Sequence, residues 1–210
     1  MRITITLSLL LIIAPAFAQN VWDLKKDKDG IKVYTRSVGG SSMKATKAVT
    51  ILNCDLHTCV AVLKDIDHLK NLFPDCSVSK KIEQSEMEQI HYLELDAPWP
   101  VTDRDAAFRL VYRFDSESQS VIVDANPITG KYPEQKGKVR LTTGKGEWRF
   151  RQISEQTTEV IYSAHIEPGG SIPMWLANSV VEENPYRMFT NFSELIKLER
   201  YRGKKFGFIN

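Results

Sequence analysis

The feature that most constrains the fold is a long series of strand-like segments, which fills residues 77–166. Short alternating runs of apolar and polar residues recur there, and turn-forming residues separate one run from the next. The breaks fall at Gln84-Ser85, at the proline-rich residues 97–105, at residues 115–118, at Asn126-Pro127, at Lys136-Gly137 and at Ser154-Glu155. Strands joined by such short connections predict one antiparallel meander.

The two faces of this sheet are expected to differ in polarity. Trp148 and Phe150 alternate with charged residues, and Tyr162 falls on the same parity in the following segment. Because successive side chains of a strand point to opposite faces, one face should be apolar and aromatic and the other charged.

Shorter elements precede this series. A turn at residues 27–30 leads into an alternating strand at 31–36, and Gly39-Gly40 turns toward a strand at 45–52, which predicts a β-hairpin. Asp55 is placed to cap a helix over residues 56–72, where apolar residues recur at helical spacing until Pro74.

Residues 171–201 predict one long amphipathic helix, with Ser171 as N-cap, Pro173 early enough to be tolerated and a kink at Asn184-Pro185. Its apolar face is expected on the concave side of the sheet, which makes the fold class α+β. That face carries Ile172, Trp175, Leu176, Val180, Met188, Phe189, Phe192, Leu195 and Ile196. If the aromatic residues on the facing surfaces of sheet and helix leave a gap, the gap is a tunnel. If these residues fill the gap, they form an ordinary core.

Residues 1–18 have the features of a cleaved signal peptide: Arg2, an apolar run at 3–13 and the small residues of Ala16-Phe17-Ala18. The run is shorter than the ~20 residues of a membrane span, which favours cleavage over a retained anchor. Residues 19–210 are expected to form one domain, periplasmic or secreted. The formal net charge of +2 offers no broad field to attract nucleic acid, and a monomer is expected.

Two prolines stiffen residues 97–105 (APWPVTDRD). A stiff loop between two strands that carries an exposed Trp99 can act as a lid, and an indole suits the boundary of lipid headgroups. Asp103, Arg104 and Asp105 are interpreted as an ion-pair cluster that fixes this loop, in preference to an acid-base site.

The sequence favours neither catalytic nor metal chemistry. Its four histidines are scattered, with no His pair at i and i+4 beside a glutamate and no Cys-x-x-Cys. Gly-x-Ser-x-Gly is absent, and the spacing of Gly137 and Gly144 does not fit a phosphate loop. No cofactor and no metal are therefore expected. Cys54 and Cys59 either form a bridge or stay buried thiols, and their spacing leaves both open.

Four motifs follow one another along the chain: residues 22–36, residues 98–105 (PWPVTDRD), residues 133–140 (PEQKGKVR) and residues 169–173 (GGSIP). In this order they resemble parts of the START domain, the steroidogenic-acute-regulatory-protein-related lipid-transfer family. The first resembles its first strand, the second its lid loop with the Arg-Asp signature, the third a stretch of its steroid-regulatory members, and the fourth the approach to its C-terminal helix. The resemblance implies a helix-grip fold, in which a curved antiparallel sheet wraps around the C-terminal helix and encloses a hydrophobic tunnel for one lipid. It implies no catalysis.

The chain departs from the sterol-binding members of this family at two positions. Those members carry an arginine six residues after the Arg of the Arg-Asp pair and an acidic residue thirteen before it, where this chain has Leu110 and His91. The ligand is therefore expected to be more apolar or differently held.

The expected function is that of a non-catalytic protein that holds one lipid or other hydrophobic molecule and carries it between membranes, with transient membrane contact. One alternative is a helix-grip enzyme, a cyclase or hydrolase with His91 or the pair Asp103 and Asp105 as acid and base; another is a regulatory module with a collapsed cavity. Strand parity and helical spacing select the lipid-binding or lid residues Trp99, Leu110, Tyr112, Trp148, Phe150, Tyr162, Trp175, Met188 and Phe192, with His91 and Arg104 as polar anchors.

Overall fold

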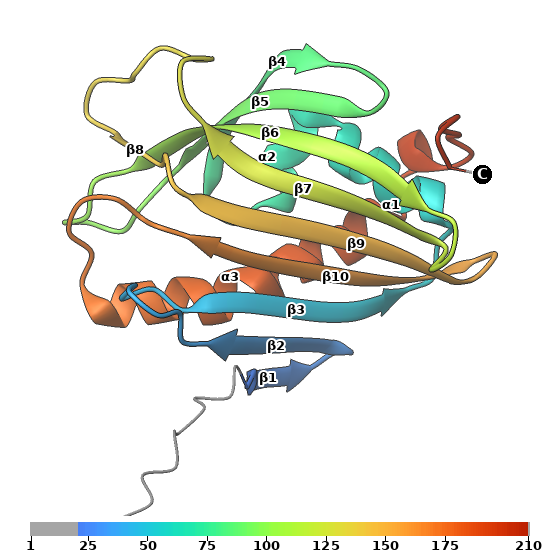
Figure 1. Ribbon diagram of the computed structural model, residues 1–210, viewed down its shortest axis with the longest axis horizontal. Helices are drawn as coiled ribbons and strands as arrows, with labels where there is room; N and C mark the ends of the chain where they lie inside the picture. Colours follow the sequence, from blue (N-terminus) through green and yellow to red (C-terminus); the bar gives the residue numbers. More distant parts are fainter. Residues whose placement is uncertain (1–20, 210) are drawn as a thin grey trace, which may run out of the picture.

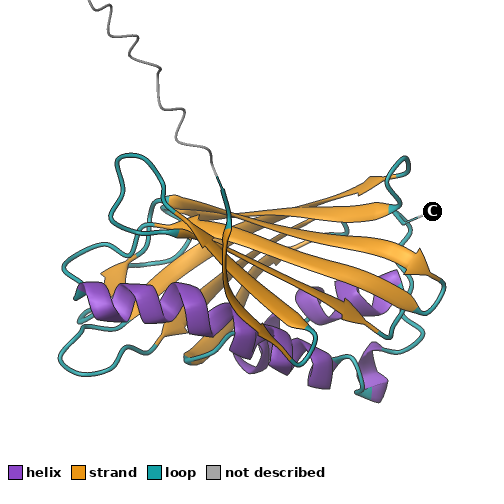
Figure 2. Cartoon of the chain, turned by 90° about the horizontal axis from the view of Figure 1, so that it is seen from below, coloured by secondary structure: helices purple, strands orange, loops and turns teal. Residues whose placement is uncertain are grey.

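The chain forms one curved sheet with its helices gathered on the concave side (Figures 1 and 2). This arrangement comes from a computed structural model that describes residues 21–209. The strands are β1 (Asp23–Lys28), β2 (Ile31–Arg36), β3 (Ala45–Leu52), β4 (Cys76–Gln84), β5 (Glu88–Leu95), β6 (Arg104–Asp115), β7 (Ser120–Ile128), β8 (Val139–Arg140), β9 (Gly144–Ser154) and β10 (Thr157–Ile166). The helices are α1 (Leu56–Lys64), η1 (Ile66–His68), α2 (Leu69–Leu72), α3 (Met174–Leu195) and η2 (Glu199–Tyr201).

The strand order across the sheet is β1-β2-β3-β10-β9-β7-β6-β5-β4. Each pair along this path is antiparallel, whereas β8 pairs with β6 in parallel. The predicted meander is therefore present from β4 to β10, with β8 as an excursion, and the opening hairpin joins it through β3 and β10. The predicted α+β helix-grip architecture is confirmed.

The helices divide the concave face between them. α3 packs along β2 and β3, while α1, η1 and α2 pack against the ends of β9, β10 and β4 (Figure 2). Between them Trp148, 1% exposed, lies 6.0 Å from Phe189 and 5.9 Å from Phe192, measured between ring centroids. Within residues 21–209, no helix combines the length and the apolar character needed to cross a membrane.

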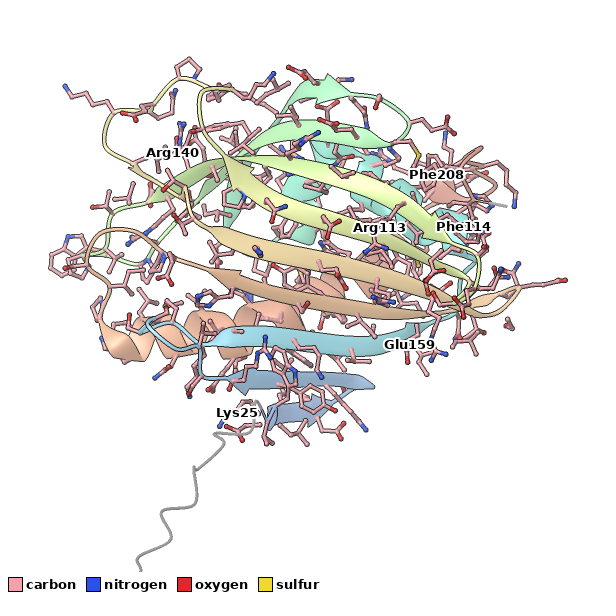
Figure 3. The ribbon with its side chains drawn as sticks, in the orientation of Figure 1. Lys25, Arg113, Phe114, Arg140, Glu159 and Phe208 are labelled. Carbon is pink, nitrogen blue, oxygen red and sulfur yellow. The ribbon has the colours of Figure 1, made fainter. Side chains whose placement is uncertain are left out.

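The outer face of the sheet is charged, as predicted from strand parity (Figure 3). Arg113 on β6 lies 3.8 Å from Asp124 on β7, and Arg151 on β9 lies 2.9 Å from Glu159 on β10. Such cross-strand pairs keep one face of the sheet solvated while the other is buried.

The helix predicted over residues 56–72 is broken at Asp65. Asp55 caps its first turn as expected, because its carboxylate accepts a hydrogen bond of 2.7 Å from the Thr58 amide. Asp65, however, leaves the helical conformation, and its carboxylate is held by the Tyr201 hydroxyl at 3.0 Å and the His68 ring at 2.9 Å. The local bond to His68 and the long-range bond to Tyr201 compete with helix continuation and give α1, η1 and α2 instead of one helix.

Two boundaries also differ from the prediction. Asn126-Pro127 is not a break but part of β7. Pro127 lies beyond the last residue of β7 that pairs with β9, so the N–H that proline lacks is not needed for a hydrogen bond to β9. Ser171 does not cap the C-terminal helix: α3 starts at Met174 with Pro173 as its N-cap, continues through Pro185 and ends at Leu195.

Strand β1 was not predicted because its six residues are almost all charged, as is common at a sheet edge.

Candidate binding cavity

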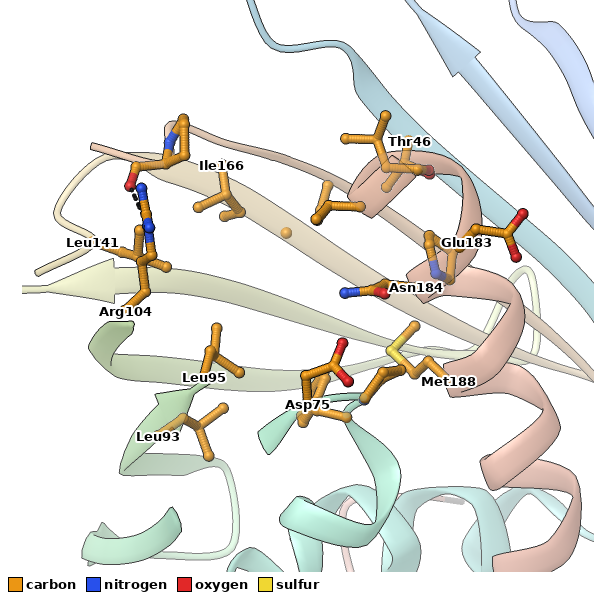
Figure 4. Close-up of a pocket in the computed structure, with 18 of the residues that line it drawn as sticks. Thr46, Asp75, Leu93, Leu95, Arg104, Leu141, Ile166, Glu183, Asn184 and Met188 are labelled. Atoms are coloured by element: carbon orange, nitrogen blue, oxygen red, sulfur yellow. Dashed lines mark hydrogen bonds between the residues drawn. The ribbon is translucent and has the colours of Figure 1, made fainter. Parts of the chain in front are cut away.

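A cavity of about 880 Å³ lies between the concave face of the sheet and α3 (Figure 4). Its size falls within the usual range of ligand sites, and most of its lining is apolar. The predicted gap between sheet and helix therefore exists, and the facing aromatic residues do not fill it.

A row of small residues across four strands creates the space. Ala125 on β7 pairs with Gly146 on β9, Gly146 pairs with Ala164 on β10, and Ala164 pairs with Thr46 on β3. All four line the cavity. Since paired residues share a face of the sheet, these four small residues lie side by side and leave a trough beneath α3.

The next row toward the α1 end of the sheet is large and aromatic. Val123, Trp148 and Tyr162 are paired across β7, β9 and β10. The rings of Trp148 and Tyr162 are 4.7 Å apart and both line the cavity, and burial raises the pKa of Tyr162 to about 12. This aromatic row closes the inner end of the trough.

Arg104 closes the opposite end. It is 7% exposed and donates hydrogen bonds to the carbonyl of Thr102 in the lid loop (residues 96–103) and, at 3.3 Å each, to those of Pro168 and Gly169 before α3 (Figure 4). Arg104 thus ties the two loops that flank the mouth of the cavity. The expectation that it forms an ion pair with Asp103 and Asp105 was wrong, because its described partners are backbone carbonyls.

The two aspartates have other partners. Asp105, 1% exposed, accepts two hydrogen bonds of 2.8 Å from Arg140 on β8 and one of 2.9 Å from Tyr92 on β5. Burial by itself would raise the pKa of the Asp105 carboxyl, but these bonds outweigh it and lower the pKa. Asp103 accepts a bond of 3.0 Å from the Ala97 amide, which lowers its pKa and braces the lid loop. The cluster does fix the loop, through contacts other than those predicted.

A polar rim runs along the side of the cavity. The Arg187 guanidinium on α3 pairs with the Asp75 carboxylate at 2.8 and 2.9 Å, and Asn184 lies one helical turn away (Figure 4). Arg187 and Asp75 are about half exposed, so this rim faces water as well as the cavity.

His91 is the polar residue of the cavity that is most deeply buried, with 2% exposure. Its Nδ1 lies 3.4 Å from the Gln89 amide nitrogen, and its ring lies 6.0 Å from that of Phe108. Burial lowers the pKa of His91 to about 3, so the ring is neutral at physiological pH.

The structure sorts the predicted site residues into three groups. Leu110, Trp148, Tyr162, Met188, His91 and Arg104 line the cavity. Tyr112, Phe150 and Phe192 are buried in the core next to it. Trp99 and Trp175 are at the surface, 92% and 65% exposed.

The position of Trp175 is a correction to the prediction for α3. Leu176, Ala177 and Val181 form the buried stripe at the start of this helix, one residue out of phase with the predicted set. The phase was wrong because it was counted from Ile172, which precedes the helix. Trp99 is exposed on the lid loop, as expected.

Sequence reasoning missed the small-residue row and the Asp105 to Arg140 pair. The small-residue row could have been found from the sequence, because Gly146 and Ala164 share the parity of Trp148 and Tyr162. The ion pair leaves no local pattern in the sequence, since 35 residues separate its partners.

Cys54 and Cys59 are free thiols with their sulfurs 3.3 Å apart, and burial raises the pKa of Cys59 well above its usual range. Among residues 21–209, no group of three or more His, Cys, Asp or Glu side chains is placed to hold a metal ion.

Known proteins share this architecture. A STAR-related lipid transfer protein from Xanthomonas axonopodis is 34% identical and superposes with a TM-score of 0.78, covering 84% of this chain and 99% of that one. An aromatase/cyclase from Streptomyces, 14% identical, has the same fold with a TM-score of 0.50 over 76% of this chain and 94% of that one.

Proteins that are similar in sequence point to the same family as the structural neighbours. An uncharacterized protein of Pseudomonas aeruginosa is 35% identical over 185 residues, 88% of this chain and 91% of its own length. The phosphatidylcholine transfer protein of Rattus norvegicus is 25% identical over 169 residues, 78% of either chain. The model of the START domain matches residues 9–194. The chain therefore belongs to the START domain family.

Proposed function

We propose that this protein holds one lipid or other hydrophobic molecule in the cavity and carries it between membranes without changing it chemically. Membership of the START domain family indicates lipid or hydrophobic ligand binding. The observation that carries the finer proposal is the largely apolar cavity of about 880 Å³ with a tethered loop at its mouth.

The energetics of such binding are favourable. Removing about 500 Å² of acyl or ring surface from water contributes on the order of 10 kcal/mol at about 25 cal/mol per Å², before ordering costs are subtracted. An apolar trough can therefore retain a lipid with few polar contacts.

The titratable groups around the cavity support a carrier more than an enzyme. His91 is neutral and contacts an amide, Asp75 is paired with Arg187, and Asp105 is paired with Arg140. An enzyme needs an acid and a base that converge on one reacting atom, and these groups are each engaged separately. The fold shared with a cyclase keeps the enzyme alternative open to test.

Two tryptophans support membrane contact at the mouth of the cavity. Trp99 on the lid loop is 92% exposed and Trp175 in the first turn of α3 is 65% exposed. The loop between β5 and β6 and the start of α3 lie at the same end of the molecule (Figure 1). Exposed indoles favour a headgroup boundary, so this end is suited to touch a membrane while the ligand leaves.

The predicted leader, residues 1–18, lies outside the described residues. We retain it as part of the proposal, with a periplasmic or secreted, monomeric carrier that crosses the aqueous space between two membranes.

Native mass spectrometry with lipid extraction tests the proposal directly. The protein is purified without detergent from the compartment in which it accumulates, and one lipid per chain is the expected result. A bare mass together with no lipid uptake from vesicles in vitro would contradict the carrier function. A bound molecule that is released chemically altered would favour the enzyme.

Transfer of a fluorescent lipid between donor and acceptor vesicles tests the membrane-facing end. Trp99→Ala and Trp175→Ala should each slow transfer severalfold while leaving the amount of bound lipid unchanged. Ile153→Ala is the matched control, since Ile153 is 49% exposed at the end of β9, away from the mouth. Equal rates for all three variants would remove the tryptophans from the proposal.

A further inference from the structure

The inner part of the cavity contains a hydrogen-bond donor that no described protein group uses. His91 and Leu95 share one face of β5, and Leu95 pairs with Arg104 at the mouth. His91 therefore lies four residues deeper along the strand, about 13 Å at 3.3 Å per residue. It is 2% exposed and lines the cavity.

The neighbours of His91 fix which nitrogen carries its proton. The Gln89 amide nitrogen donates to the Leu63 carbonyl at 3.1 Å, and the Tyr112 hydroxyl donates to the Gln89 amide oxygen at 2.9 Å. The same amide nitrogen faces His91 Nδ1 at 3.4 Å, so Nδ1 is the acceptor in that contact. A neutral imidazole has one donor and one acceptor, which puts the proton on Nε2.

The hydrogen bonds of His91 among residues 21–209 involve Nδ1 and not Nε2, and Nε2 is not among the fully enclosed polar atoms that lack a partner. A buried N–H without a partner costs free energy, and such groups are normally satisfied by protein, water or ligand. Because His91 lines the cavity, the unused donor is available to whatever occupies it.

We propose that the cavity binds an uncharged lipid whose hydroxyl, ketone or ester oxygen accepts a hydrogen bond from His91 Nε2. This inference rests on the proposed function and narrows it to a class of ligand. The oxygen lies at the inner end of the lipid, and the apolar remainder covers the small-residue row and extends along the strands toward the mouth.

The surroundings argue against a phosphate or carboxylate at this depth. The lining residues nearest to His91 in the strand register are Phe108, Leu93 and Leu110, and none carries a charge. Arg104 lies at the mouth, where it is bonded to three carbonyls. Arg187 is paired with Asp75 on the half-exposed rim, and Lys44 precedes β3, five strands from β5 across the sheet. An anion beside His91 would therefore be buried away from these cations, which is far more costly than burying a neutral oxygen.

Lipids that copurify with the full chain give the first test. Wild type, His91→Phe and His57→Phe are expressed with the leader, purified without detergent and extracted for mass spectrometry. His57→Phe is the matched control, because it makes the same substitution at a partly exposed histidine that does not line the cavity. Wild type and His57→Phe should retain an uncharged, oxygen-bearing lipid that His91→Phe retains about tenfold less well.

Defined probes give the second test, as competitors of the neutral dye N-phenyl-1-naphthylamine. Hexadecan-1-ol and cholesterol should displace the dye from wild type at concentrations about tenfold lower than 1-bromohexadecane and cholest-5-ene, which lack the hydroxyl. His91→Phe should abolish this preference, and His91→Gln should restore part of it through its amide N–H. Palmitate should compete poorly with every variant.

The tautomer is tested without any ligand or substitution. Two-dimensional NMR of the 15N-labelled histidines should show His91 protonated at Nε2, whereas a proton on Nδ1 would overturn the inference even if the variants fail to fold. Retention of phospholipid or fatty acid by wild type, or equal alcohol binding by His91→Phe, would also overturn it while leaving the carrier function intact. Absence of any bound lipid or probe would overturn both.

Discussion

Asp105 shows how a single residue stabilises the end of this sheet next to the cavity. Its carboxylate is buried between Arg140, which β8 brings alongside β6, and Tyr92, whose ring stacks on that of Tyr132 at 3.8 Å. This buried ion pair adds to the backbone hydrogen bonds that Val139 and Leu141 donate to the Asp103 and Asp105 carbonyls, and together they hold the two-residue strand β8 in place. The pair is a matter of stability, since it lies outside the cavity lining.

Arg140→Leu should therefore lower the free energy of unfolding by about 3 kcal/mol, because it leaves a buried carboxylate without its cation. Urea denaturation at neutral pH measures this change. Arg113→Leu serves as control and should cost less than about 1 kcal/mol, since its contact with Asp124 is exposed and 3.8 Å long. Similar losses for the two variants would contradict the role given to Asp105.

His91 makes stability depend on pH. Burial lowers its pKa to about 3 from an ordinary value of 6.5. Between these values the unfolded chain binds the proton and the folded chain does not, so stability falls as the pH decreases from 6.5. The loss from His91 should reach about 3 kcal/mol at pH 4.

Urea denaturation between pH 4 and 7 checks this. His91→Phe lacks the group and should show a shallower decline than wild type. Partial burial also lowers the pKa of His57, so His57→Phe should change the slope in the same direction but by less. Parallel curves for wild type and His91→Phe would mean that His91 is protonated in the folded protein.

At the scale of elements, the cavity arises from strand register. Ala125, Gly146 and Ala164 lie on three strands and are adjacent only because β7, β9 and β10 pair as they do. Gly146 is also tightly confined, since a Cβ there would lie 3.1 Å from the Ala125 carbonyl oxygen. One shift of register would replace this small row by large side chains and fill the cavity.

Local pattern accounts for what could and could not be predicted at this scale. Alternation located β9, β10 and their shared apolar face, and Asp55 located the start of α1. Neither signal reports on contacts between distant residues, which broke the helix at Asp65 through Tyr201 and gave Arg104 carbonyl partners. The predicted apolar face of α3, which included Trp175, was wrong because the start of the helix was misplaced.

Ala164→Phe should fill the trough from the sheet side and reduce bound lipid at least tenfold. The ring enters open space rather than packed core, so unfolding should change by less than about 1.5 kcal/mol. Lipid extraction and urea denaturation measure the two quantities. Ser163→Phe, on the opposite face of β10, should retain lipid normally; unchanged lipid content in Ala164→Phe would place the ligand elsewhere.

At the scale of the whole molecule, the mouth of the cavity is bordered by parts of the chain that are far apart in sequence. The lid loop follows β5, whereas Pro168 and Gly169 connect β10 to α3, and Arg104 bonds to both segments. In the proposed carrier, separation of these segments or movement of α3 would widen the mouth through which the ligand leaves. Arg104 therefore couples the two sides of the mouth, a role its position next to two aspartates did not suggest.

Arg104→Met should release this coupling. Amide hydrogen exchange is expected to speed up together in residues 96–103 and 167–173, because one side chain supplies bonds to both segments, while β9 and β10 keep their protection. Lipid should also leave faster in the vesicle assay. Arg109→Met is the matched control, since Arg109 lies on the same strand and pairs with Glu88 on the outer face at 2.8 Å. Faster exchange in the lid loop alone would show that Arg104 braces that loop without coupling it to α3, and ligand release would then depend on the lid loop by itself.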